Sequence, residues 1–288
     1  MKLDSAKRSQ ARRWRDVVVE DRGRVRVNGA ELYYEVGREG QPLMLLHDGL
    51  LDRRVWDDQF VAFARLYRTI RYDRRGYGKS SMPDRTFSDV SDLHRLLRHL
   101  GTEKAYLMGM SNGGKVALEF ALEHPRMVAA LVLVGPNLGG YCPSEEKQRR
   151  VSEILSVARE RGTEAGVEAW MEDPFYPPAK ERSAARERVR QIARENLPRL
   201  LFTPGLREEP DPPTVKSLSR IVAPTLVLVG ERDDRNNREI ASILASRLSR
   251  SDKNVFSGCG HLVNLERPEE FYCVVADFLD AQSHPSEC

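Results

Sequence analysis

The stretch that most constrains this chain is Tyr106–Gly114, which reads Tyr-Leu-Met-Gly-Met-Ser-Asn-Gly-Gly. It sets Ser111 between Gly109 and Gly113, just after an apolar run and just before a segment with helical spacing. This G-x-S-x-G arrangement is typical of a sharp, strained turn from strand to helix, in which the glycines allow close backbone packing and the serine hydroxyl projects above the sheet edge. The pattern predicts a nucleophilic serine, which needs a base, an acid and an oxyanion hole elsewhere in the chain.

Short apolar runs and helical patterns alternate on both sides of this turn. The first 16 residues are basic and unpatterned, and a β-rich segment follows at 17–21. The Asn-Gly pair at 28–29 predicts an antiparallel hairpin between segments 24–27 and 30–36. Further strands are expected at 43–46, 67–72, 105–108, 129–134, 225–229 and 254–256. The helical patterns between most of them indicate crossover connections, a mainly parallel sheet flanked by helices, and therefore an α/β fold.

The alternation stops at Gly135-Pro136 and resumes only near Pro224. The intervening sequence is highly charged and helical, and prolines interrupt it. We predict an α/β core formed by residues 1–136 and 219–288, with residues 137–218 inserted as a helical lid. Four aromatic residues of the insertion are candidates for a pocket-facing side, with packing of the lid on the core as the alternative: Trp170, Phe175, Tyr176 and Phe202.

Composition narrows the class of partner. The chain has 288 residues, and 46 basic against 43 acidic residues give a net charge of +3, which offers little reason to expect a nucleic-acid partner. No window approaches the roughly 18 consecutive apolar residues of a membrane span. Four scattered cysteines form no zinc-like cluster. We expect a cytoplasmic protein with free thiols, no membrane partner, and an oligomeric state that the sequence leaves open, a homo-oligomer included.

Two loops near the C-terminal end carry the groups that Ser111 lacks. Gly230-Glu-Arg-Asp233-Asp234 follows one apolar strand, and Gly260-His261 follows the next. In a parallel sheet such loops all lie at the carboxyl edge, so side chains distant in sequence can converge there. Asp234 competes with Asp233 for the role of the acid, and the Gly-x-x-Asp spacing favours Asp233.

Found together, these segments resemble an α/β-hydrolase. The resemblance rests on four blocks, which are His47-Asp-Gly49, Tyr72–Ser80, Gly109–Gly114, and Gly230-x-x-Asp233 with Gly260-His261. It implies an α/β-hydrolase fold in which Ser111 is the nucleophile, His261 the base and Asp233 the orienting acid. It also implies an oxyanion hole formed by the amides of Gly49 and Asn112, and it requires no metal or organic cofactor.

Two residues depart from the family's pattern. Asp48 stands where a glycine usually follows the histidine of the oxyanion loop, and a carboxylate there would oppose the developing negative charge. We therefore expect Asp48 to point outward or to pair with Arg53 or Arg54. Asn112 stands where an apolar residue is common, and it would add a polar group beside the nucleophile, favouring a polar acyl part. Arg74, Arg75 and Lys79 are expected to shape their loop rather than bind an anion.

The sequence thus predicts a serine hydrolase acting on a small carboxylic ester or lactone, similar to the carboxylesterase and enol-lactonase branch of the family. A carbon–carbon bond hydrolase or a perhydrolase with the same triad is the enzymatic alternative. An alternative of another class is a ligand-binding member of the fold with negligible turnover.

Overall fold

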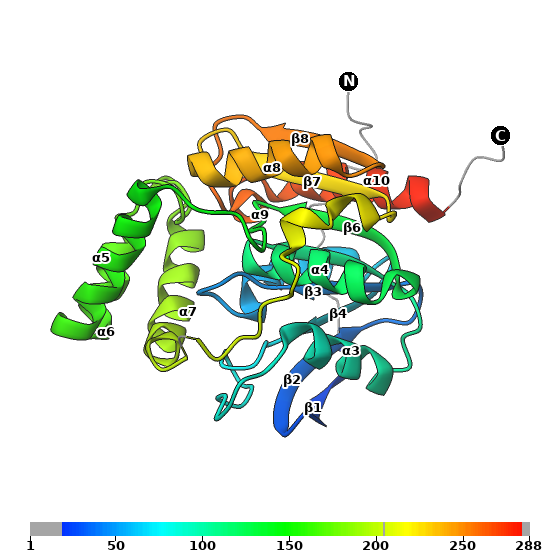
Figure 1. Ribbon diagram of the computed structural model, residues 1–288, viewed down its shortest axis with the longest axis horizontal. Coiled ribbons are helices and arrows are strands. Elements are labelled where there is room, and N and C mark those ends of the chain that lie inside the picture. The colour runs from blue at the N-terminus through cyan, green and yellow to red at the C-terminus, as the bar shows by residue number, and fades with distance from the viewer. Residues whose placement is uncertain (1–18, 204, 284–288) are drawn as a thin grey trace.

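The computed structural model describes residues 19–203 and 205–283, which form a sheet with helices on both faces (Figure 1). The strands are β1 (Asp21–Val27), β2 (Ala30–Gly37), β3 (Pro42–Leu46), β4 (Arg68–Tyr72), β5 (Ala105–Met110), β6 (Val128–Val134), β7 (Thr225–Gly230) and β8 (Ser251–Phe256). The α-helices are α2 (Asp57–Phe63), α3 (Asp89–His99), α4 (Asn112–Glu123), α5 (Glu145–Arg161), α6 (Thr163–Met171), α7 (Ser183–Leu201), α8 (Arg235–Arg247), α9 (Val263–Glu266) and α10 (Pro268–Ser283). Short 3-10 helices are η1 (Arg53–Trp56), η2 (Pro125–Met127), η3 (Thr214–Lys216) and η4 (Leu218–Arg220).

The strand order brings two loops of the predicted site together. The eight strands lie in the order β1-β2-β4-β3-β5-β6-β7-β8. Strands β1, β2 and β4 pair antiparallel, whereas the pairings from β4 through β3 to β8 are parallel. From β3 the chain goes first to β4 on one side and later to β5 on the other, so β3 marks the point where the strand order reverses. Leu46 at the end of β3 lies opposite Gly109 of β5, which sets His47–Gly49 beside the turn at Ser111.

The predicted α/β architecture is confirmed. Asn28 and Gly29 both have positive φ, 48° and 79°, as a two-residue hairpin between β1 and β2 requires. Each expected strand from 43–46 onward has a counterpart in the structure. Strand β8 begins at Ser251, three residues before the strand that the sequence predicted at 254–256. Residues 1–16 and the first part of the β-rich segment at 17–21 lie outside the described residues. The four-residue helix α9 was not predicted, because it is too short to show a helical period.

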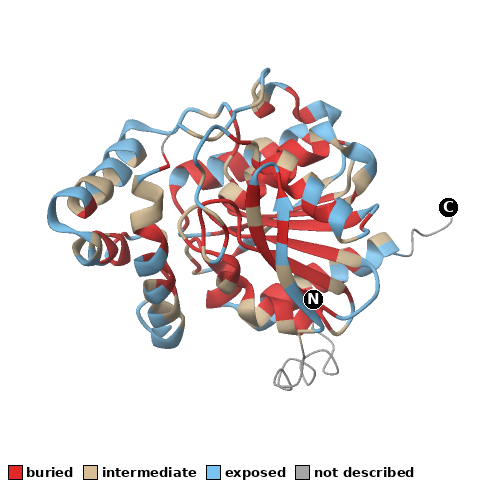
Figure 2. Cartoon of the chain, turned by 90° about the horizontal axis from the view of Figure 1, so that it is seen from below, coloured by how far each residue is buried: buried red, intermediate tan, exposed pale blue. Residues whose placement is uncertain are grey.

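Alternate residues of the strands feed two separate cores. In β3, Leu43 and Leu45 face the core under α2 and α10, whereas Met44 and Leu46 face the core under α3, α4 and α8. This is the two-residue period of a strand that is covered on both faces. The central strands are accordingly buried, and the outer faces of the helices are exposed (Figure 2).

Helices α5, α6 and α7 lie between β6 and β7 in sequence and stand beside one end of the sheet (Figure 1). We refer to them as the inserted helices. Gly166 of α6 lies so close to α5 that a Cβ there would come within 2.4 Å of the Ala158 Cβ. Helix α7 continues through Pro198 and ends at Leu201. Throughout 19–203 and 205–283, no helix has the length and apolarity needed to cross a membrane.

The turn at Ser111 is strained, and its neighbours leave no room for side chains. Ser111 has φ 50° and ψ −115°, a region that non-glycine residues rarely adopt. A Cβ on Gly109 would come within 2.4 Å of the Gly113 carbonyl oxygen, and one on Gly113 within 2.3 Å of the Leu46 carbonyl oxygen. The two glycines therefore let strand β5 turn directly into helix α4 against the end of β3.

Replacing Gly109 by alanine should destabilise the fold through this backbone clash. We expect Gly109→Ala to lower the free energy of unfolding by about 1–3 kcal/mol or more, the range for overpacked sites. Gly258→Ala is the matched control, because Gly258 has φ 68° but no atom within 4 Å of an added Cβ. It should cost only about 1 kcal/mol for the backbone conformation. Urea unfolding measures both, and equal effects would contradict the clash.

Candidate active site

The loops at the carboxyl edge of the sheet surround a cavity of about 330 Å³. Ser111 and His261 both line it, together with residues of the oxyanion loop and of the inserted helices. The polar lining residues are Asp48, Ser111, Asn112, Asn137, Lys147 and His261, and the apolar and aromatic ones include Leu50, Val151, Ile154, Leu155, Trp170, Tyr176, Leu197 and Leu200. The cavity thus combines a polar floor on the core with a mostly apolar wall on the inserted helices.

Of the two candidate acids, Asp233 contacts His261. The imidazole Nδ1 lies 3.1 and 3.0 Å from the two carboxylate oxygens of Asp233. Asn237, a fully buried residue in the first turns of α8, donates from Nδ2 to Asp233 Oδ1 at 3.1 Å. Gly135 at the end of β6 packs against the same pair, because a Cβ there would come within 2.9 Å of the imidazole. The pair is therefore held by Asn237 on one side and by Gly135 on another.

The charge of Asp233 governs the protonation of His261. Burial by itself disfavours the charged imidazolium, but the charge of Asp233 and its hydrogen bond to Nδ1 favour it, and the pKa of His261 is raised above its ordinary value. A proton on Nδ1, directed at Asp233, leaves Nε2 as the basic nitrogen. This is the tautomer that a general base next to a serine requires.

Asp234 has a different set of partners, on the inserted helices. Its carboxylate contacts the guanidinium of Arg150, and Lys147 Nζ lies 3.7 Å away. Arg150 also binds Asp173 at 2.7 Å. Lys147 further donates to Asn237 Oδ1 at 2.7 Å. The neighbouring carboxylates thus divide two tasks, since Asp233 contacts the histidine and Asp234 ties helix α5 to the core.

The expectation for Asp48 is wrong. Its side chain is only 5% exposed, and it lines the cavity instead of pointing outward. Oδ1 accepts the amides of Leu50 at 2.9 Å and Leu51 at 2.6 Å, a local turn that draws the carboxylate inward. The arginines expected to pair with it have other carboxylates within reach, Arg53 those of Glu35 and Asp73, and Arg54 those of Asp52 and Glu195. Burial raises the pKa of Asp48, although the two amides oppose this.

Gly49 and Asn112, predicted to supply the oxyanion hole, lie side by side at the cavity. A Cβ on Gly49 would come within 2.3 Å of the Asn112 Nδ2, so a side chain there would collide with Asn112. Asn112 is the first residue of α4, and its amide therefore has no helical carbonyl to bind. Its side chain accepts from Asn137 Nδ2 at 2.7 Å. The polar group that the sequence predicted beside Ser111 thus belongs to a pair of asparagines.

The aromatic residues of the insertion have different environments. Trp170 and Tyr176 line the cavity, and the Tyr176 ring meets the His261 ring edge to face at 5.1 Å. Phe175 contributes its backbone, because its carbonyl accepts the His261 amide at 3.0 Å. Phe202 was wrongly proposed as pocket-facing, since it follows the last residue of α7 and is 78% exposed. Helical spacing could not reveal this, because the chain leaves the helix at that point.

The histidine and arginines of the oxyanion region act as supports of the loops. His47 is fully buried, its Nε2 accepts the Arg74 amide at 2.9 Å, and its Nδ1 lies 3.0 Å from the Asp48 carbonyl oxygen. Burial holds the pKa of His47 well below its ordinary value, so it is neutral. Arg74 binds the Asp48 carbonyl and Asp89, and Arg75 binds Asp92 at 2.8 Å. This agrees with a loop-shaping role for the arginines.

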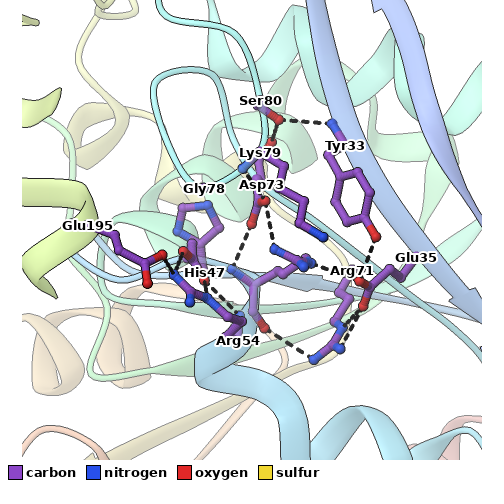
Figure 3. Close-up of polar contacts among 12 residues, drawn as sticks. Tyr33, Glu35, His47, Arg54, Arg71, Asp73, Gly78, Lys79, Ser80 and Glu195 are labelled. Atoms are coloured by element: carbon purple, nitrogen blue, oxygen red, sulfur yellow. Dashed lines mark hydrogen bonds and ion pairs between the residues drawn. The ribbon is translucent and has the colours of Figure 1, made fainter. Parts of the chain in front are cut away.

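A buried ion network underlies the same loops (Figure 3). Asp73 accepts the Arg53 Nη1 at 2.8 Å, the Arg53 amide at 3.1 Å and the Lys79 amide at 2.8 Å. Glu35 accepts from Arg53, from Arg71 at 2.7 Å and from the Tyr33 hydroxyl at 2.9 Å. Since η1 begins at Arg53, the network joins the segment after the oxyanion loop to the loop after β4.

Removing Asp73 should leave the buried Nη1 of Arg53 and two amides without their acceptor, while the Nε of Arg53 keeps Glu35. We expect Asp73→Ala to lower the free energy of unfolding by about 3–5 kcal/mol, the usual cost of breaking a buried ion pair from one side. Asp84→Ala is the control, because Asp84 pairs with Arg85 on the surface, where both side chains are mostly exposed. It should leave stability unchanged. Urea unfolding measures both, and a small effect at Asp73 would argue against the network's importance.

Comparison with known proteins agrees with the class that this fold and cavity define. Residues 43–272 match the model of the alpha/beta hydrolase family. A 2-hydroxy-6-oxononadienedioate/2-hydroxy-6-oxononatrienedioate hydrolase from Burkholderia vietnamiensis is 30% identical over 91% of this chain and 93% of its own length. A 2-hydroxymuconate semialdehyde hydrolase from a Pseudomonas species is 29% identical over 83% and 87%. A solved thermophilic esterase from Thermogutta terrifontis, in a malate-bound structure, is 26% identical with a TM-score of 0.75, covering 91% of this chain and 99% of that one.

The chain belongs to the alpha/beta hydrolase family, because the family model spans most of its length. Its relatives include named esterases as well as hydrolases of other bonds. Family membership therefore supports hydrolysis without specifying the bond that is cleaved.

Residues that the sequence did not single out also form part of this region. Asn237 and Gly135 contact the Asp233–His261 pair, and Asn137 pairs with Asn112. Asn237 follows Asp233 by four residues, about one helical turn, which is the one signal that could have found it. Asn137 and Gly135 lie just after β6, at the same sheet edge as the predicted loops.

Proposed function

We propose that this protein is a serine hydrolase that cleaves a small carboxylic ester or lactone through an acyl-enzyme on Ser111. The observation that carries the proposal is that Ser111, on its strained turn, and His261, paired with Asp233, line one cavity. Nucleophile, base and acid come from three loops at one sheet edge, in the chain order typical of this fold.

In the acylation step, the Ser111 hydroxyl oxygen attacks the carbonyl carbon of the ester, and His261 Nε2 takes its proton. Asp233 stabilises the imidazolium that forms. The amides of Gly49 and Asn112 hold the negative charge of the tetrahedral oxygen. The intermediate collapses with loss of the alcohol, which receives the proton from His261, and the acyl group remains on Ser111. A lactone follows the same course, with its alcohol still attached to the acyl group.

In the deacylation step, His261 takes a proton from a water molecule as that water attacks the acyl carbon. Collapse of the second intermediate returns the proton to Ser111 and releases the acid. The inserted helices act as a lid in this scheme, since they supply most of the apolar wall, and the loop between α6 and α7 supplies the Phe175 carbonyl that accepts the His261 amide. A covered site excludes water from the approach of the ester until the acyl-enzyme has formed.

A carbon–carbon bond hydrolase is the second candidate, and the Burkholderia relative favours it. The charges at the cavity argue for an ester over a doubly anionic substrate. Lys147 is the one cationic lysine or arginine among the described cavity-lining residues, and it already contacts Asp234 and Asn237. Asp48 adds a carboxyl group to the same cavity. A dicarboxylate would therefore meet little positive charge and one like-charged group.

Replacing Ser111 tests the reaction directly. We expect the wild type to hydrolyse a short-chain p-nitrophenyl ester and to be labelled by a fluorophosphonate probe. Ser111→Ala should abolish labelling and lower kcat by about 10⁵-fold or more. Ser242→Ala, an exposed serine of α8, is the control and should behave as wild type. Absence of both labelling and turnover in the wild type would refute the proposal, and labelling without ester turnover would favour the second candidate.

The pH dependence tests the Asp233–His261 pair. Only neutral imidazole acts as a base, so kcat/KM should rise with pH as His261 loses its proton, with a midpoint above its ordinary value of 6.5. Asp233→Asn removes the charge that raises this pKa, so the acid limb should move to lower pH while kcat falls by about 10⁴-fold. The measurement is kcat/KM for a p-nitrophenyl ester between pH 5 and 9. An acid limb that stays in place in Asp233→Asn would contradict this assignment.

A further inference from the structure

We propose that Asp48 makes the enzyme selective for esters that carry a cationic ammonium group, an inference that rests on the proposed ester hydrolysis. Asp48 is a buried carboxyl group at the floor of the cavity that also holds Ser111 and His261. It stands on the loop that carries Gly49, next to the predicted oxyanion hole. The acyl-transfer scheme gives it no task, and its charge would work against the oxyanion.

The two oxygens of Asp48 have unlike surroundings. Oδ1 accepts the amides of Leu50 and Leu51, which fix the side chain in place and oppose the rise in the pKa of Asp48 that burial causes. Oδ2 has no hydrogen-bond or ion-pair partner within 19–203 and 205–283. Arg74 lies close by, but its guanidinium binds the Asp48 backbone carbonyl and Asp89 instead of the carboxylate. The inward carboxylate therefore keeps one acceptor for a group that enters the cavity.

The other charges around the cavity are already matched. Lys147 of helix α5 contacts Asp234 and Asn237, and His261 faces Asp233. Among the charged side chains that line the cavity in the described chain, Asp48 is thus the one with no oppositely charged group bonded to it. A buried, uncompensated carboxylate is costly, and a bound cation removes that cost. The apolar side chains Ile154, Leu155, Leu197 and Leu200 leave room in the same cavity for the uncharged part of a substrate.

A cation beside Asp48 would also affect catalysis. With a neutral ester, the Asp48 charge raises the energy of the tetrahedral oxyanion, because the two negative charges share a cavity that excludes water. With an ammonium ester, the substrate's own charge offsets that of Asp48, and the amides of Gly49 and Asn112 act unopposed. Asp48 therefore favours cationic esters and disfavours neutral ones, so removing its charge should move the two rates in opposite directions.

Two pairs of isosteric substrates measure this preference. On the acyl side, the ethyl ester of trimethylglycine is compared with ethyl 3,3-dimethylbutanoate. On the alcohol side, acetylcholine is compared with 3,3-dimethylbutyl acetate. Each pair exchanges a permanently charged nitrogen for carbon, so the amine's own titration does not enter. Intrinsic differences in reactivity cancel when the cationic-to-neutral ratio of kcat/KM in a variant is divided by the ratio in the wild type.

The decisive variant is Asp48→Asn, because an asparagine Oδ1 can still accept the amides of Leu50 and Leu51. We expect it to lower the cationic-to-neutral ratio at least about 10-fold in one pair, the typical effect of a contact with a charged group, and to raise kcat/KM for the neutral ester. The responding pair identifies the side of the ester that carries the charge. Asp252→Asn makes the same change on the exposed surface of β8 and should leave both ratios unaltered.

A binding measurement separates this inference from the proposed reaction. Calorimetry with the trimethylglycine ester and with acetylcholine, on Ser111→Ala with and without Asp48→Asn, reports recognition without turnover. Weaker binding by the double variant supports the role of Asp48 even if no ester is hydrolysed. Ratios unchanged by Asp48→Asn in both substrate pairs, with equal binding by the two variants, would overturn the inference. Hydrolysis and fluorophosphonate labelling of the wild type report separately on the proposed function.

Discussion

The contact on which the site depends is the close approach of three backbone segments at the turn between β5 and α4. The carbonyl of Leu46 leaves no room for a Cβ on Gly113, and that of Gly113 leaves none for a Cβ on Gly109. This proximity forces Ser111 into a positive φ and brings the end of β3 beside the start of α4. Gly49 and Asn112 are neighbours for the same reason. The buried parallel strands on either side hold Ser111 in this unfavourable backbone conformation. Part of the stability of the sheet therefore offsets the cost of that conformation.

Within the described residues, each charged side chain that lines the cavity has an oppositely charged partner, except Asp48. Asp233 faces His261, Asp234 faces Arg150 and Lys147 of the inserted helices, and the network around Asp73 supports the loops beneath. Asp48 alone among the described cavity residues presents an uncompensated carboxylate oxygen. Because burial amplifies electrostatic effects, one such group can bias the choice of substrate.

Much of the site followed from the sequence by a simple argument. Parallel strands put all their following loops at one edge, so the loops with Ser111, Asp233 and His261 could be expected to meet without a structure. The contact of Gly135 could not, because it depends on how β6 packs in three dimensions, and only its spacing of four residues from Asp233 pointed to Asn237. Asp48 was expected to avoid the nucleophile on electrostatic grounds, but the local amides of Leu50 and Leu51 draw it inward. Phe202 was misplaced because spacing alone does not show where a helix ends.

By itself the sequence determined the α/β fold, the strained turn at Ser111 and the order of the loops at the sheet edge, because these depend on local periodicity, glycine geometry and chain connectivity. Tertiary structure alone decided which of two adjacent aspartates contacts His261, which faces of the inserted helices line the cavity, and which way the Asp48 carboxylate points. Each of these is an orientation of a side chain, set by contacts between segments far apart in the chain. No pattern along one segment encodes such a contact, since it depends on the final packing of all of them.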